Sequence, residues 1–240
     1  MKPLVIAVLL LALAGCQKSN TVVTDAPDIS ATDSVITPPK PFVTESPLYL
    51  IDSVTIDGKI FTVVQAYPGS KSELDLRILH KGDTIYRHNS IATNGFEFED
   101  FDGDGTKDIR MHFVSNIDGY SELIMFDKDR QIFKAVKHFE LFPEPEKISG
   151  TKYWYSYHSS GCADSNWDSD LFYIKNFEAI AIGTISGKFC VDEAAKGISI
   201  YKLNLFKPTL IQHLKEEPDK YSDKWDFIKG YWNDNYNTFQ

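Results

Sequence analysis

The feature that most restricts the fold is a series of short β-favouring runs, separated by turn residues, that begins at residue 48. The first two runs, 48–56 and 59–67, flank Asp57-Gly58, which suits a tight hairpin because both positions tolerate positive φ. Further strands are expected at 74–80, 84–87, 96–99, 109–114, 122–126, 132–136, 152–157, 171–174, 179–185 and 198–205. Many short antiparallel strands predict a sandwich, a barrel or a propeller, and no strict internal repeat chooses among these.

The C-terminal segment differs because its apolar residues follow helical spacing. Trp225, Ile228 and Trp232 fall on one face at i, i+3 and i+7, and Ser222 can cap the first turn. We expect an amphipathic helix that packs this face on the sheet, with a partner-binding helix as the alternative. The predicted fold is therefore a mostly β, antiparallel, short-stranded domain, propeller-like or a sandwich, with a C-terminal helix.

Residues 1–15 have the features of a secretory signal peptide. Lys2 precedes an apolar run over residues 4–13, which is too short to span a bilayer as a helix but has the length of the central region of a signal. The run ends in Leu13-Ala14-Gly15-Cys16, which resembles the lipobox of bacterial lipoproteins. This resemblance implies cleavage before Cys16 and a lipid on its thiol. Gln17, where Asp is the usual inner-membrane retention signal, implies an outer-membrane destination.

Residues 16–47 are rich in Thr, Ser, Asp and Pro and have no apolar periodicity, which is typical of a disordered tether. A tether of this length has a typical span of roughly 30 Å and an extended limit of roughly 100 Å. Residues 48–240 then remain as one β-rich domain, a length that fits a single core. We expect this domain to be held at a membrane of the bacterial cell envelope by the lipid on Cys16.

The charge of the chain argues against a nucleic-acid partner. Its formal net charge is -9, and its 25 Lys and Arg residues are scattered among 34 Asp and Glu residues rather than clustered. A cation or a basic protein is a better-matched partner. The sequence has no G-x-S-x-G, no H-E-x-x-H and no glycine-rich phosphate loop, so we do not expect an enzyme. A carbohydrate-processing enzyme with paired carboxylates in a cleft is the catalytic alternative.

Two cysteines remain after Cys16, and they are Cys162 and Cys190. In an oxidising compartment, two thiols in a secreted domain favour a disulfide over a metal pair, because neither belongs to a C-x-x-C arrangement. We therefore expect these two residues to be bridged.

The most distinctive internal motif is the acidic stretch at residues 100–108. It places carboxylates at positions 1, 3, 5 and 9 of a loop, namely Asp100, Asp102, Asp104 and Asp108. Gly105 at position 6 permits a sharp turn. Calcium is a hard cation that takes six to eight oxygen ligands, and alternate side chains of a tight loop converge on one centre. The motif therefore predicts a calcium site.

The carbonyl of Thr106, at position 7, is expected to supply a further ligand. The motif is not an EF-hand, because position 12 is Met111 rather than the glutamate that closes such loops, so Asp108 is expected to complete the shell. The alternative is a solvated acidic turn without an ion. A second acidic stretch, at 164–170, has no glycine at position six, and we expect it to be a solvated loop.

The stretch from 96 to about 148 resembles a family of periplasmic, calcium-binding, β-propeller-like lipoproteins. The resemblance rests on the acidic loop with its flanks (98–105 and 108–110), on Leu123-Ile124-Met125-Phe126-Asp127, and on Gln131-Ile132-Phe133. The better-understood members inhibit lysozyme-type peptidoglycan hydrolases or act as immunity proteins against them. The chain departs from the family in its loop at 115–120 and in its hairpin turn at 127–130.

The loop at 115–120 is our candidate for partner binding, through Asn116, Asp118 and Tyr120. An aromatic ring with a hydroxyl is a combination common at interface hot spots, although Tyr120 can instead simply pack on the sheet. We expect a membrane-tethered, calcium-binding envelope lipoprotein that binds and inhibits a basic lysozyme-type hydrolase. The alternative is a non-inhibitory structural or adhesion module that uses the calcium loop as a scaffold.

Overall fold

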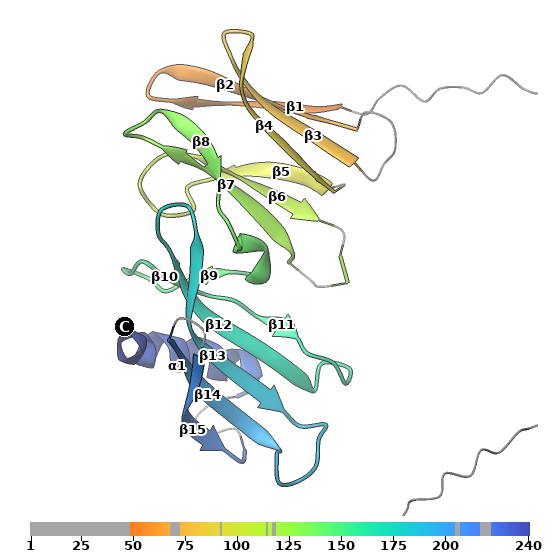
Figure 1. Ribbon diagram of the computed structural model, residues 1–240, viewed down its shortest axis with the longest axis vertical. Coiled ribbons are helices and arrows are strands. Elements are labelled where there is room, and N and C mark those ends of the chain that lie inside the picture. Colours follow the sequence, from red (N-terminus) through yellow and green to blue (C-terminus); the bar gives the residue numbers. More distant parts are fainter. Residues whose placement is uncertain are drawn as a thin grey trace, which may run out of the picture. The chain divides into compact units, whose positions relative to one another are not determined.

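A computed structural model describes residues 49–67, 73–91, 93–113, 115–116, 119–204, 207–216 and 222–240 (Figure 1). In the first two of its sheets, the neighbouring strands follow one another in chain order. The predicted signal peptide (1–15), Cys16, the tether (16–47) and Asp118 lie outside the described residues. Among the described residues, the helices are too short or too polar to cross a bilayer.

Within the described ranges the strands form three antiparallel sheets. The first contains β1 (Tyr49–Ile56), β2 (Lys59–Ala66), β3 (Glu73–His80) and β4 (Asp83–Ile91) in chain order. The second contains β5 (Thr93–Glu99), β6 (Asp108–Phe113), β7 (Ser121–Asp127) and β8 (Ile132–Ala135), again in chain order.

The third sheet has the order β15-β14-β13-β12-β10-β9, with β11 paired to β12. Its strands are β9 (Glu146–Lys147), β10 (Tyr153–Tyr155), β11 (His158–Ser159), β12 (Asn166–Ile174), β13 (Ala179–Lys188), β14 (Gly197–Asn204) and β15 (Lys207–Leu214). The helical elements are η1 (Phe139–Leu141), α1 (Lys224–Asn235) and η2 (Tyr236–Phe239). The predicted mostly β, antiparallel fold with a C-terminal helix is confirmed.

The hairpins form where the turn chemistry predicts them. Asp57 and Gly58 have φ of 50° and 75°, and they connect Ile56 to its partner Lys59 as a two-residue turn. Alternation along the strands then buries one face. In β2 the side chains of Phe61 and Val63 are buried and belong to the core shared by the first two sheets. Such alternation fixes the register, because a slip by one residue would expose the buried set.

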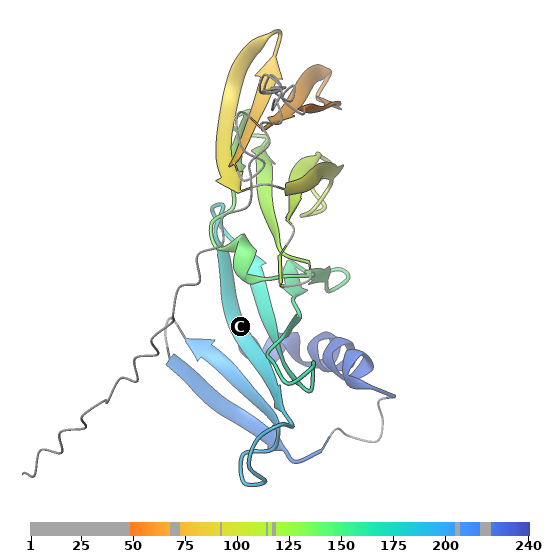
Figure 2. The same cartoon turned by 90° about the vertical axis from the view of Figure 1, so that its right-hand side faces the viewer.

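Helix α1 lies on one face of the third sheet (Figure 1, Figure 2). It begins after Asp223, whose Oδ1 accepts the amides of Trp225 at 2.9 Å and Asp226 at 3.0 Å, so the predicted cap at Ser222 is wrong by one residue. Trp232 is fully buried and donates from its indole nitrogen to Ser169 Oγ at 2.8 Å.

The predicted apolar face of this helix is corrected at Trp225. Its side chain is 47% exposed, whereas Phe227, Ile228 and Trp232 are buried. The buried stripe therefore follows i, i+1 and i+5, because the helix turns Phe227 rather than Trp225 toward the sheet.

Two further expectations are wrong. Residues Asp168 and Asp170, which we expected in a solvated loop, lie within β12, because the neighbouring Trp167, Ser169 and Leu171 are buried on the other face of that strand. Strand β15 was not expected, because all but the last of its residues are exposed and its sequence therefore shows no alternation. Pro208 fits there, since β15 is an edge strand.

Candidate metal centre

The acidic motif forms the loop that joins β5 to β6 in the second sheet (Figure 1). Glu99 pairs with Asp108, so the two ends of the loop are held side by side. Between them, one carboxylate oxygen from each of Asp100, Asp102 and Asp104 lies within 4.8 Å of the other two. In the part of the chain that the structure describes, this is the one group of three or more acidic, histidine or cysteine side chains with such spacing. The structure thus brings together three of the predicted ligands.

Local hydrogen bonds curl the loop so that alternate side chains converge. The amides of Gly103 and Gly105 donate to the two oxygens of Asp100, at 2.9 and 3.0 Å. The amide of Asp104 donates to Asp102 Oδ1 at 3.1 Å. Gly103 and Gly105 have φ of 81° and 84°, a region that a residue with a Cβ atom seldom occupies. The glycines therefore set the turn, and the aspartates both close it and face its centre.

The second residue of the loop anchors it in the core. Phe101 is 7% exposed, and its ring stacks on Trp154 with centroids 5.1 Å apart and planes 11° apart. Its ring also meets Phe139 edge-on at 5.1 Å. Because Trp154 belongs to β10, this contact ties the loop to the third sheet as well as to its own. Aromatic packing thus anchors the start of the loop in the core.

Asp108 is buried and does not belong to the group of three converging carboxylates. Its oxygens accept the amides of Phe101 at 3.2 Å and Phe126 at 3.0 Å. Burial, followed by the charges of Asp102 and Asp104, raises the pKa of Asp108 to about 7. The structure therefore shows Asp108 as an acceptor that joins the loop to β7, and its ligation of calcium stays a prediction.

Thr106 also supports the loop through its own atoms. Its amide donates to Asp104 Oδ1 at 2.7 Å, and its hydroxyl donates to the same oxygen. Burial alone would raise the pKa of Asp104. The two bonds from Thr106 and the charge of Lys128 outweigh burial and hold this pKa below its usual value. Burial and the charges of Asp104 and Asp100 raise the pKa of Asp102. The predicted role of the Thr106 carbonyl as a ligand stays a prediction.

Two ammonium groups lie against the rim of the loop. Lys147 donates to the carbonyl of Asp102, and its Nζ lies 5.1 Å from the centroid of the Trp154 ring. Lys128 donates to the carbonyl of Asp104, and its Nζ is 3.5 Å from Asp104 Oδ1. Two cations drawn to the same turn show how strongly its oxygens favour positive charge. Calcium fits this donor set, since carboxylate and carbonyl oxygens are the ligands it prefers.

The predicted partner-binding loop is described in part. Asn116 is exposed, and Asp118 lies outside the described residues. Tyr120 is half-buried, with its ring edge-on to Phe113 at 5.4 Å and its carbonyl accepting the Phe113 amide at 3.1 Å. Burial, then the charges of Glu122 and Glu140, raises the pKa of Tyr120. Tyr120 thus packs on the sheet, and a role for this loop in binding stays a prediction.

The predicted disulfide is confirmed. Cys162 and Cys190 are bonded, with Cα atoms 6.3 Å apart, and they are 28 positions apart in sequence. The bond ties the turn before β12 to the segment that follows β13. It lies in the third sheet, away in sequence from the acidic loop.

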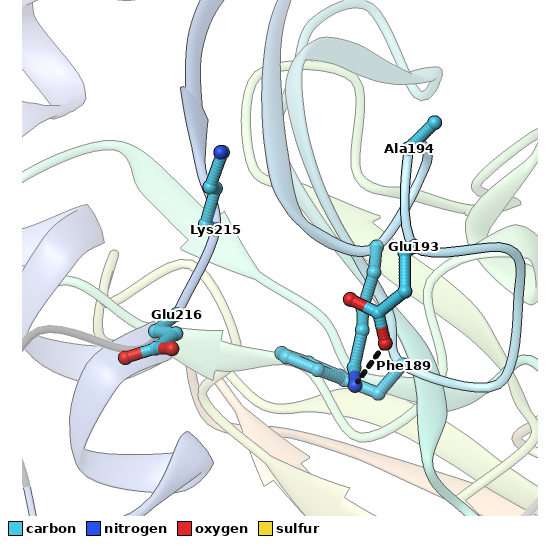
Figure 3. A pocket seen from close by; sticks show the side chains of 6 residues that line it. Phe189, Glu193, Ala194, Lys215 and Glu216 are labelled. Carbon is cyan, nitrogen blue, oxygen red and sulfur yellow. Dashed lines mark hydrogen bonds and ion pairs between the residues drawn. The ribbon is translucent and has the colours of Figure 1, made fainter.

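Two cavities were not foreseen from the sequence. One, of about 750 Å³, is lined by Phe189, Glu193, Ala194, Lys196, Lys215 and Glu216 (Figure 3). Its ion pair joins Glu193 and Lys196, which are three positions apart in one exposed turn. The other, of about 250 Å³, is lined by carboxylates and aromatic rings from β10, from its flanks and from α1. Sequence spacing carries no signal for it, because its residues are far apart along the chain.

No family model and no curated protein matches the chain. A solved structure that is similar to it is that of a Xanthomonas type IV secretion system related protein. The two chains are 14% identical, the match covers 68% of this chain and 93% of the other, and the TM-score is 0.43. Similarity at this level carries neither a fold nor a function to this protein.

Proposed function

We propose that this chain is a calcium-binding lipoprotein of the bacterial envelope that binds and inhibits a basic, lysozyme-type peptidoglycan hydrolase. The observation that carries the calcium part is the convergence of Asp100, Asp102 and Asp104 within 4.8 Å on one loop. Three carboxylates at such distances repel one another unless a cation lies between them. The hydrolase part rests on the resemblance given above and on charge.

The bound ion would act through β6. This strand begins at Asp108, the last residue of the acidic stretch, and ends at Phe113. The amide of Phe113 donates to the carbonyl of Tyr120, at the other end of the 115–120 loop. A six-residue strand is roughly 17 Å long, so the ion and the candidate loop lie at opposite ends of one short, rigid element. Calcium would therefore stiffen the base from which the loop projects and reduce the ordering cost of binding.

The charge of the protein fits a basic partner. A formal net charge of -9 attracts a cationic enzyme and speeds the encounter, while affinity comes from a few well-packed contacts. The association rate is therefore expected to fall with rising salt, whereas the dissociation rate changes less.

The test is a panel of purified envelope hydrolases, assayed for binding and inhibition with calcium and with a chelator. The variants are Asp102→Ala with Asp104→Ala and, as a control that also removes two carboxylates, Asp52→Ala in β1 with Asp83→Ala in β4, both of which are exposed. We expect inhibition by the wild type and by the control, and weaker inhibition by the Asp102→Ala, Asp104→Ala variant. Calcium binding without binding of any hydrolase would overturn the inhibitor proposal and favour a structural or adhesion module.

A further inference from the structure

A small cavity opens between the start of helix α1 and strand β10. Its volume is about 250 Å³, and its walls come from Tyr155 in β10, from Tyr157 just beyond it, and from Trp225 in the first turn of the helix. Three carboxylates line it as well, those of Glu144, Glu146 and Asp226. Neither the calcium loop nor the disulfide uses any of these side chains.

The aromatic walls are held in fixed positions. The rings of Tyr157 and Trp225 lie with centroids 4.1 Å apart, and Lys224 Nζ lies 5.0 Å from the centroid of each. Lys224 donates to the Tyr157 hydroxyl at 2.7 Å and also binds the carboxylate of Asp164. Its charge is therefore met within the chain, and its contacts fix the two rings rather than leave them to be ordered by a ligand.

Trp225 is far more exposed than the other tryptophans of the chain. All four tryptophans of the chain are described, and Trp154, Trp167 and Trp232 are between 0% and 4% exposed. Trp225 is 47% exposed, although it costs free energy to leave so large an apolar surface in water. A tryptophan that is left in water beside a preformed cavity is typical of a binding surface.

The charge of the cavity selects a cation. Three carboxylates stand against the one ammonium of Lys229 among the residues that line it. Glu146 accepts the hydroxyl of Tyr155, and Asp226 accepts the hydroxyl of Ser222, so both carboxylates are held in place. Aromatic walls disfavour a small hard ion, which needs oxygen on all sides. A planar guanidinium stacks on an indole and pairs with a carboxylate through two parallel hydrogen bonds.

We propose that this cavity receives an arginine side chain from a basic protein partner, with its guanidinium on the Trp225 ring and its N–H groups on Glu144 and Glu146. The proposal rests on the proposed function, which supplies the basic partner. It names the kind of residue on that partner and the place where it binds.

One residue at the rim of the cavity, Glu144, contacts the candidate partner-binding loop. The amide of Glu144 donates to the carbonyl of Gly119 at 3.3 Å. A Cβ atom on Gly119 would lie 2.1 Å from Glu144 Cγ, and the φ of Gly119 is 70°. Glycine is therefore needed for the loop to approach the rim of the cavity. A partner that contacts Asn116 or Tyr120 would thus also reach Glu144.

The test uses three blocked tripeptides, Gly-Arg-Gly, Gly-citrulline-Gly and Gly-Lys-Gly, with the full-length protein. Because the other tryptophans are buried, a change in emission on titration reports mainly on Trp225, and calorimetry gives the affinities independently. We expect saturable binding of the arginine peptide and binding at least about tenfold weaker for the citrulline peptide, which lacks the charge. Equal affinity for the citrulline or the lysine peptide overturns the proposal.

Isosteric variants complete the test. Glu144→Gln with Glu146→Gln is expected to weaken binding of the arginine peptide at least about tenfold. Glu193→Gln with Glu216→Gln, at the cavity of Figure 3, makes the same change of charge and is expected to leave binding unchanged. Equal affinity of the first variant and the wild type overturns the proposal, provided that both melt at the same temperature.

The failure of this proposal and that of the proposed function are distinguishable. If a hydrolase binds the wild type and the Glu144→Gln, Glu146→Gln variant equally well, the arginine site is refuted, but the proposed inhibition of a hydrolase is not. If the arginine peptide binds but no hydrolase does, the arginine site is supported and the proposed inhibition of a hydrolase is refuted.

Discussion

At the scale of single residues, the acidic loop combines side chains that close the turn with side chains that would hold an ion, and the two roles fall on the same aspartates. Asp100 accepts two amides of its own loop, yet it also faces Asp102 and Asp104. Each carboxylate oxygen has two lone pairs, so an amide and a cation can share it. The bonds that close the turn therefore leave Asp100 able to ligate an ion as well.

Calcium is expected to stabilise the folded domain. At a free concentration about 100 times the dissociation constant, a ligand that binds only the folded state adds roughly 2.7 kcal/mol. Asp102→Ala with Asp104→Ala should abolish this gain, because two of the three converging carboxylates are removed. Thermal melts with calcium and with a chelator measure it. An identical melting temperature of the wild type in both conditions, with no heat of binding, contradicts the prediction.

Asp170 is expected to make stability depend on pH. Burial raises the pKa of Asp170 above its usual 3.8, and the charge of Asp168 raises it further, although Thr184 and His158 act in the opposite direction. The folded state therefore binds this proton more tightly than the unfolded state. The group favours folding most below about pH 4 and opposes it increasingly as the pH rises through the folded pKa.

The variant that tests this dependence is Asp170→Asn, which keeps the shape of the side chain and its acceptor oxygen. Its melting temperature should exceed that of the wild type near pH 8 and equal it near pH 3, because only the charged form is penalised. Melts over the pH range decide the point. A variant that follows the wild type at every pH shows that Asp170 does not cause the pH dependence of stability.

Some residues of the candidate site could be predicted from the sequence, and others could not. The three converging aspartates could be predicted, because their spacing and the glycine at position six act within one turn. The bond of Asp108 to the amide of Phe126 could not, since it spans 18 positions and depends on the pairing of β6 with β7. The cavity beside Trp225 was hidden for the same reason, because it is made from three separate segments.

At the scale of elements, helix α1 shows where local signals are precise and where they fail. Asp223 accepts two amides of the first turn, whereas the hydroxyl of Ser222 donates to Asp226. Both residues are good caps, and the sequence alone does not choose between them. Strand β2 could be predicted because one of its faces is buried and its sequence alternates. Strand β15 could not, because it is an exposed edge strand whose sequence shows no alternation.

Removing the cap is expected to weaken the helix. Asp223→Ala should lower the free energy of unfolding by about 1 kcal/mol, because two amides lose their acceptor. Ser222→Ala, which removes a hydroxyl outside the cap, should cost less. Urea unfolding of the two variants, side by side, gives both values. A larger loss for Ser222→Ala would place the cap at the residue expected from the sequence.

At the scale of the whole molecule, the described domain and the N-terminal residues carry different parts of the proposed function. The domain holds the acidic loop, the disulfide and the cavity, while the proposed lipid attachment falls on Cys16, outside the described ranges. The helices of the described part are too short or too polar to span a bilayer. On the resemblance of residues 13–16 to a lipobox, attachment is predicted to depend on Cys16.

Replacing that cysteine is expected to release the protein from membranes. Cys16→Ser removes the thiol that the lipobox resemblance marks for lipid, and two or more acyl chains are what makes such anchoring stable. The measurement is fractionation of cells followed by a high-salt wash, with Cys162→Ser as a control that keeps the anchor. Retention of the Cys16→Ser protein in the washed membranes contradicts the lipoprotein prediction.

The stacking of Phe101 on Trp154 has a consequence for how loops of this kind can change in length. One inserted or deleted residue would pull Phe101 out from between Trp154 and Phe139, at the cost of a buried aromatic ring. Replacing the aspartates would leave that ring in place. The length of the loop is thus held by aromatic packing, whereas its charge belongs to the proposed calcium site. A chain with the same packing but without the aspartates is therefore expected to keep the nine-residue span from position 100 to position 108.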